Sequence, residues 1–188
     1  EYLFHKKPDA MLVSIRETIE ECTKYCADVE FIADDATRSD PAFLAQALST
    51  AIAAGAKTVT VCDTAGAMLP NEFTAFIREL YAAVPELKTV VLGVACSDQL
   101  SMADSCAFAA IRYGAGEIKA AAYRLDNVSL PNVAKVLGAK GEYYNAACSV
   151  RTTSMKRITD RIAWMCQTGR SETSPFDNGV REDTDSIY

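Results

Sequence analysis

Two short polar segments of this chain carry side chains of the kinds that bind or activate small substrates. The first segment is Asp34-Asp-Ala-Thr-Arg-Ser-Asp40, and the second is Cys62-Asp-Thr-Ala-Gly66. Each one follows a short apolar run, and one βα repeat separates them. Parallel α/β proteins keep their functional groups in the loops at the carboxyl ends of the strands. We therefore predict that the two segments lie side by side and form a site.

The hydrophobic periodicity alternates between helix and strand along the chain. We predict helices over residues 8–27, 41–54, 70–83, 101–113 and 151–168, with a short helix after Pro131, and strands over 29–33, 58–62, 89–94 and 117–122. Asp40 provides an N-cap for the helix that begins at Pro41. This alternation indicates an α/β fold of parallel β/α repeats, and four such repeats make half of a (β/α)₈ barrel.

The composition is that of one soluble globular domain, with 188 residues, 49% hydrophobic and 23% charged. We predict a partial barrel domain of four βα units over residues 1–169 and a polar tail or linker over 170–188. The net charge of −6 argues against nucleic acid as a partner. No apolar run approaches the ~20 residues that cross a bilayer, which argues against a membrane partner.

The seven cysteines form no Cys-x-x-Cys pair and lie in largely apolar contexts. An odd number of such cysteines is typical of a reducing compartment, and we expect a cytoplasmic location. The one histidine, His5, lies far along the chain from the candidate groups. The chain begins at Glu1 rather than at a methionine, in what reads as a loop entering a helix, and we expect it to be a fragment.

Three segments carry a resemblance to a known family: residues 29–40, Cys62-Asp-Thr-Ala-Gly66 with Pro70 beyond it, and Asn127-Val-Ser-Leu130. In register they resemble the isopropylmalate synthase and homocitrate synthase family of amino-acid biosynthesis, within the superfamily that includes hydroxymethylglutaryl-CoA lyase. The resemblance covers about residues 1–168 and implies the C-terminal half of a TIM (β/α)₈ barrel. It also implies a Claisen condensation of acetyl-CoA with a 2-oxoacid that a divalent metal holds and polarises.

The resemblance implies where the metal ligands of the family would fall on this chain. A His-x-His pair falls on Ala95 and Ser97, and a ligating asparagine falls near Tyr123, in a loop that is shorter than the family's and lacks its glycines. A methyl and a hydroxyl cannot replace two imidazoles. Neither Asp98 nor Cys96 is placed like the lost pair, and Cys96 reads as an inert buried thiol. We therefore predict a degenerate metal site and no bound cofactor.

Three residues remain as candidate substrate-binding groups. By the resemblance, Thr64 hydrogen-bonds the substrate carboxylate, Asp34 lines the pocket in place of a glutamate, and Asp63 belongs to the same motif. Each has a structural alternative. A threonine at such a turn often satisfies only its own backbone, and Asp34, Asp35 and Arg38 also read as a charge network that holds the loop.

Three functions fit these observations. The chain is an acyltransferase domain of the 2-isopropylmalate or homocitrate synthase type, a non-catalytic homologue that serves as ligand sensor or partner subunit, or an enzyme with metal-independent chemistry. No paired acid and base support the last, and no catalytic residue is assigned. We expect the first, impaired or inactive, with a 2-oxoacid or other carboxylate as ligand. Open edge strands and an apolar inner face predict a homo-oligomer or a missing N-terminal half-barrel as partner.

Overall fold

The computed structural model describes residues 7–122 and 126–166. Its main sheet has the order β1-β2-β3-β4, and every neighbouring pair is parallel. The strands are β1 (Glu30–Ala33), β2 (Thr58–Asp63), β3 (Val91–Cys96) and β4 (Glu117–Ile118). Consecutive parallel strands joined by helices confirm the predicted fold of parallel β/α repeats.

Four of the helices, α1, α2, α3 and α5, have a proline in their first two positions, and α2 and α4 end just before a glycine. They are α1 (Pro8–Thr23), α2 (Pro41–Ala53), α3 (Pro70–Ala83), α4 (Ala103–Arg112), α5 (Leu130–Tyr144) and α6 (Thr152–Cys166), with short 3₁₀ turns η1 (Ala36–Arg38) and η2 (Pro85–Thr89). The predicted cap of α2 is confirmed, because Asp40 Oδ1 accepts a hydrogen bond from the Phe43 N–H at 2.8 Å. Within the described ranges, no helix combines the length and the apolar character needed to cross a bilayer.

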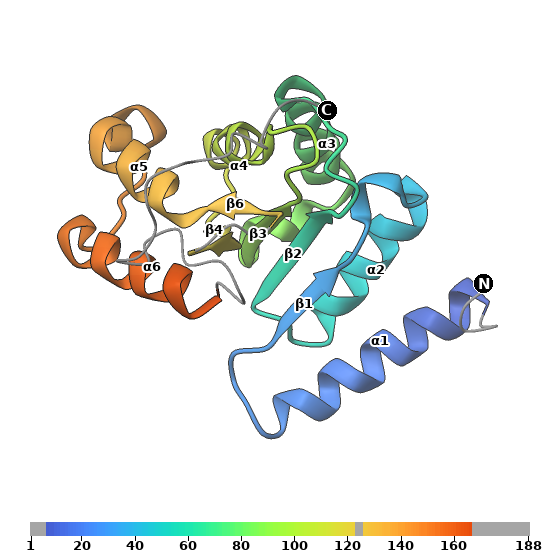
Figure 1. Cartoon of the computed structure of the whole chain (residues 1–188). Coiled ribbons are helices and arrows are strands. Elements are labelled where there is room, and N and C mark those ends of the chain that lie inside the picture. Colours follow the sequence, from blue (N-terminus) through green and yellow to red (C-terminus); the bar gives the residue numbers. More distant parts are fainter. Residues whose placement is uncertain (1–6, 123–125, 167–188) are drawn as a thin grey trace.

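Figure 1 shows α2, α3 and α4 following one another along one side of the sheet, here called the helix-facing side. On this helix-facing side, Val59, Val61, Leu92 and Val94 are each at most 1% exposed. They form one apolar core with helical residues that include Leu48, Phe73 and Ile77. Strand residues alternate between the two sides, so the intervening residues lie on the opposite side, here called the inner face.

The inner face carries charges that join the two edges of the sheet. Lys119, just after β4, lies 2.8 Å from the Glu30 carboxylate on β1 and also contacts Glu117. Thr60 Oγ1 donates a second hydrogen bond to Glu30 at 2.5 Å. Because β1 and β4 are the first and last strands of the order, a direct contact between them requires a strongly curved sheet. This curvature is the geometry of a barrel wall.

These contacts set the charge states of the pair that spans the sheet. Burial alone raises the pKa of Glu30, but the hydrogen bonds from Lys119 and Thr60 and the Lys119 charge outweigh it and hold that pKa below its usual value. The hydrogen bonds to Glu117 and Glu30 raise the pKa of Lys119. Both groups are therefore held in their charged forms.

The predicted bounds differ from the structure at α1, which ends at Thr23 and not at residue 27, and at β3, which is Val91–Cys96 and not 89–94. Two other predicted elements differ more. The fourth strand is interrupted at Lys119, and the second part, β5 (Ala120–Ala121), pairs in parallel with β6 (Val128–Ser129), which was not predicted. A strand of two residues has no periodicity to detect. The helix after Pro131 is not short, because α5 has 15 residues, with a kink at Lys140. The predicted tail over 170–188, His5 and Tyr123 lie outside the described residues.

Candidate functional site

Three loops meet at the carboxyl ends of β1, β2 and β3. Gly66 in the β2 loop has a φ of 59°, and a Cβ there would lie 2.7 Å from the Ser97 carbonyl oxygen of the β3 loop. Only glycine allows this close approach. The Ser97 N–H also donates to the Asp63 carbonyl oxygen at 3.0 Å. The β2 and β3 loops are therefore held against each other at one edge of the sheet.

The β1 and β2 loops meet through Thr64 and Asp34, two of the three predicted binding residues. Thr64 Oγ1 donates to Asp34 Oδ1 at 2.6 Å. The Asp35 N–H donates to Thr64 Oγ1 at 2.9 Å and also approaches Asp34 Oδ1 at 3.1 Å. Both side chains are exposed. The prediction that the two polar segments lie side by side is confirmed, and a small molecule can reach them.

The third predicted residue, Asp63, lies beneath this surface. It is 2% exposed, and its carboxylate accepts hydrogen bonds from Thr37 Oγ1 at 3.0 Å and from the Met68 N–H at 3.3 Å. Both oxygens are thus bonded to the chain's own groups. In this arrangement Asp63 ties η1 and the start of the β2 loop together, and so fixes the backbone on which Thr64 stands.

Asp35 and Arg38 match the structural alternative. Asp35 lies in the left-handed region with a φ of 53°, a conformation that aspartate tolerates better than most residues. Arg38 Nε and Nη2 donate to its two carboxylate oxygens at 2.8 and 2.7 Å. These hydrogen bonds raise the pKa of Arg38. The pair closes the β1 loop on itself, which leaves Asp34 as the carboxylate that faces Thr64.

The positions implied for the metal ligands lie on β3 and just after it. Ala95 is opposite Cys62 in the ladder, where it offers only a methyl group. Ser97 offers a hydroxyl, and its backbone is bonded to Asp63. The asparagine position near Tyr123 is not among the described residues.

The remaining donors nearby do not fit a divalent cation. Asp98 Oδ1 accepts the N–H of Ala103, the first residue of α4, at 3.0 Å. Cys96 is 1% exposed, and burial raises the pKa of its thiol well above the usual value, so it stays protonated. In residues 7–122 and 126–166, no three histidine, cysteine, aspartate or glutamate side chains gather as a metal site requires. The donor set within these described ranges therefore does not fit the metal that the resemblance implies.

Two carboxylates near the carboxyl ends of the strands were not predicted from the sequence. Asp126 Oδ1 accepts the Asp98 N–H at 2.8 Å, and its other oxygen accepts a hydrogen bond from Gln99 Nε2. Asp104 does the same for the next segment, accepting from the Ser129 N–H at 2.8 Å. These carboxylates fix the β3 loop and β6. These contacts join residues that are far apart in sequence, so a local pattern could not predict them. The one available sign was the acidic character of Asp126 beside the Asn127 segment.

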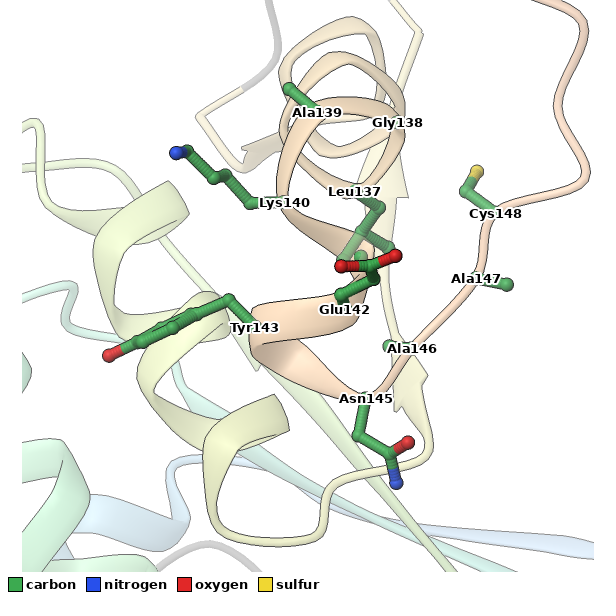
Figure 2. Close-up of a pocket in the computed structure, with 11 residues that line it drawn as sticks. Leu137, Gly138, Ala139, Lys140, Glu142, Tyr143, Asn145, Ala146, Ala147 and Cys148 are labelled. Carbon is green, nitrogen blue, oxygen red and sulfur yellow. The ribbon is translucent and has the colours of Figure 1, made fainter.

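A hollow of about 970 Å³ lies elsewhere, along the second half of α5 and the segment that follows it. Figure 2 shows that its polar side chains do not converge: Lys140 and Tyr143 extend to one side of the helix, and Cys148 lies on the other. The Tyr143 ring is already covered by the Arg112 guanidinium at 4.6 Å. The hollow lies beside the kink at Lys140 in α5 and gathers no set of groups suited to one ligand.

Comparison with known proteins identifies relatives of this arrangement. A family model described as HMGL-like matches residues 1–162. The 2-isopropylmalate synthase of Pyrococcus furiosus is 32% identical over 166 residues, which are 86% of this chain and 33% of that protein. The 2-isopropylmalate synthase of Aquifex aeolicus is 32% identical over 148 residues, 77% of this chain and 28% of that protein. The chain thus spans about a third of the length of the curated relatives it matches.

Solved structures share the fold at low sequence identity. Hydroxymethylglutaryl-CoA lyase from Pseudomonas aeruginosa has a TM-score of 0.71 at 16% identity, over 92% of this chain and 60% of that one. The carboxyl transferase domain of Rhizobium etli pyruvate carboxylase has a TM-score of 0.59 at 15% identity, over 77% of this chain and 25% of that one.

Proposed function

Because the chain belongs to the HMGL-like family, we propose that it is the C-terminal half of an acyltransferase barrel of the 2-isopropylmalate synthase type with impaired condensation activity. The observation that carries the impairment is the pair Ala95 and Ser97, which stand at the implied imidazole positions. A condensation onto a 2-oxoacid needs its carbonyl polarised, and this is the Lewis-acid role of a metal. The described side chains do not form a set that would hold one.

Ligand binding is the part of the family's activity that this chain's own residues support. The Thr64 hydroxyl and the Asp35 N–H lie 2.9 Å apart on an exposed surface, and both are donors of the kind that a carboxylate accepts. Asp63 fixes the loop beneath them. In this proposal Thr64 contacts the ligand carboxylate, Asp34 lines the same pocket, and Asp63 acts only by holding Thr64 in position.

An assay of coenzyme A release tests the impairment. The chain is incubated with acetyl-CoA, pyruvate and Mg²⁺ or Mn²⁺, and the free thiol is measured over time. We expect no release above the rate without protein, because the side chains of the described residues do not hold a metal that would polarise the carbonyl. Turnover that depends on both substrates and on protein concentration would show that the chain is an active synthase, and the proposal of impairment would be withdrawn.

A second function, partner subunit, has one observation in its favour. On the inner face, Ile32 is 53% and Val91 41% exposed, an unusual state for apolar residues in the wall of a barrel. Such a face gains stability when another copy or a complementary half-barrel covers it. A cytoplasmic location is also part of the proposal, supported by the seven cysteines, all with free thiols.

A further inference from the structure

We propose that the Asp34 carboxylate occupies the subsite that would otherwise bind a ligand's carboxylate. In this position Asp34 lowers the affinity of the site for carboxylate ligands and so sets its specificity. The inference rests on the proposed function, because it assumes that Thr64 and the Asp35 N–H form the subsite for the ligand's carboxylate. The observation that carries it is the direction of the hydrogen bonds around Thr64.

The donors of this subsite are already engaged. A threonine hydroxyl has one proton to donate, and that of Thr64 goes to Asp34 Oδ1 at 2.6 Å. The Asp35 N–H is shared between Thr64 Oγ1 at 2.9 Å and Asp34 Oδ1 at 3.1 Å. The Asp34 carboxylate therefore stands where a ligand carboxylate would stand and takes the same two donors.

The charges around the subsite act in the same direction. A ligand carboxylate bound to Thr64 would lie next to the negatively charged Asp34 carboxylate. Two like charges within a few ångströms of each other repel even in water. The nearest cation on the same loop, Arg38, is bound through two hydrogen bonds to Asp35. Asp63, from β2, is buried below and bonded to Thr37 and Met68. On the β3 side, the Asp126 carboxylate accepts from the Asp98 N–H and from Gln99 Nε2, and the Asp98 carboxylate accepts from the Ala103 N–H.

Asp34 can leave this position, because it is exposed and its contact with Thr64 is its one long-range hydrogen bond to a side chain that the structure gives. A ligand carboxylate must displace it, so the apparent affinity falls by the fraction of molecules in which Asp34 has turned away. Asp34 is thus a specificity-determining residue. Removing its carboxylate frees the Thr64 hydroxyl proton for the ligand and leaves the Asp35 N–H shared only with Thr64 Oγ1.

Calorimetric titration of the whole 188-residue chain with sodium pyruvate tests this inference. Asp34→Ala should bind pyruvate roughly 10-fold more tightly than the unmodified chain, from release of the Thr64 hydroxyl proton and loss of one negative charge. Asp34→Asn is the matched control, because its amide oxygen can still accept from Thr64 while the charge is gone. Its affinity should lie between the two. Adding Thr64→Val to Asp34→Ala should remove the gain, and circular dichroism checks that each variant is folded.

The outcomes separate this inference from the proposed function. Equal pyruvate affinity for the unmodified chain and Asp34→Ala would overturn the inference and leave the carboxylate subsite standing. Equal pyruvate affinity for Asp34→Asn and Asp34→Ala would show that only the charge of Asp34 weakens binding. The proposal that the Asp34 side chain occupies the subsite would then be wrong. A gain that survives Thr64→Val would place the pyruvate elsewhere and overturn the inference. No binding by any folded variant would overturn the subsite itself, and with it the ligand-binding part of the proposed function.

Discussion

The two faces of the sheet differ sharply in how completely this chain buries their apolar side chains. On the helix-facing side, Val61 and Leu92 are at most 1% exposed and belong to a core that the helices close. On the inner face, neighbouring strand positions hold Glu30, Thr60 and the half-exposed Ile32. One face is thus an ordinary hydrophobic core, and the other is a polar network with uncovered apolar groups at its rim.

This difference shows that the sheet has two sources of stability with different ranges. The helix-facing core is made by apolar residues that recur at helical and strand spacing, so each βα unit contributes to it locally. The inner face depends on contacts between strands that are far apart in sequence. The ion pair of Lys119 with Glu30 joins residues 89 positions apart. Substitutions on the two faces should therefore have effects of different size.

The largest expected effect is on the helix-facing core. Leu92→Ala should lower the free energy of unfolding by about 2–5 kcal/mol, since it removes buried methyl groups and leaves a cavity. Its neighbour on the same strand, Val91→Ala, should cost less than about 1 kcal/mol, because Val91 is 41% exposed. Urea denaturation measures both. Similar costs for the two would mean that the inner face is covered in solution.

A smaller and pH-dependent effect is expected on the inner face. Lys119→Met should lower stability by about 1 kcal/mol at neutral pH, a modest figure because the ion pair is about one-third exposed to solvent. The pKa of Glu30 is lowered in the folded state, so its contribution is present above its ordinary pKa and is lost as pH falls through the folded value. The pKa of Lys119 is raised, so its contribution is lost as pH rises through that raised value.

The stability difference between the unmodified chain and Lys119→Met should therefore be largest at neutral pH. It should shrink when the pH falls into the range where Glu30 is protonated, and again when the pH rises above the ordinary lysine range. Denaturation at a series of pH values measures it. A difference that stays constant across the acid range would mean that Lys119 stabilises the sheet by packing and not by its charge.

A substitution of an exposed apolar residue on the inner face should have the smallest effect on the free energy of unfolding. It should have a larger effect on self-association. The chain should self-associate as its concentration rises, which light scattering measures. Ile32→Lys should reduce that association while changing the free energy of unfolding by less than about 1 kcal/mol, since Ile32 is 53% exposed. Glu17→Lys, on the exposed face of α1, adds the same side chain elsewhere and should leave association nearly unchanged. A monomer at all concentrations would contradict the expectation.

Much of the fold could be predicted from the sequence, because its signals are local. Pro41 after Asp40 marks the start of α2, and apolar runs mark β1, β2 and β3. The pairing of β5 with β6 could not be predicted, since two residues carry no period. In the site, the neighbourhood of Thr64 and Asp34 followed from the rule for parallel strands.

The sequence did not reveal the roles of the individual carboxylates. Asp63 and Thr64 are adjacent in one motif, yet Asp63 is buried and Thr64 is exposed, because Asp63 is the last residue of the buried strand β2 and Thr64 is the first residue of the loop that follows it. The clamp formed by Asp126 on Asp98 joins loops that are far apart in sequence. Hydrogen-bond direction at Thr64 also depends on three-dimensional contacts that a motif cannot specify.

Titration calorimetry with Mn²⁺ and Zn²⁺ tests the central claim, that the metal-ligand positions of the family are lost in this chain. The unmodified chain should show no stoichiometric binding, because Ala95 and Ser97 supply no imidazole. Ala95→His combined with Ser97→His should raise metal affinity, with the gain limited by missing supporting contacts that are typically worth ~10–100-fold. Tight stoichiometric binding by the unmodified chain, abolished by Asp98→Ala, would contradict the claim and reveal a relocated metal site.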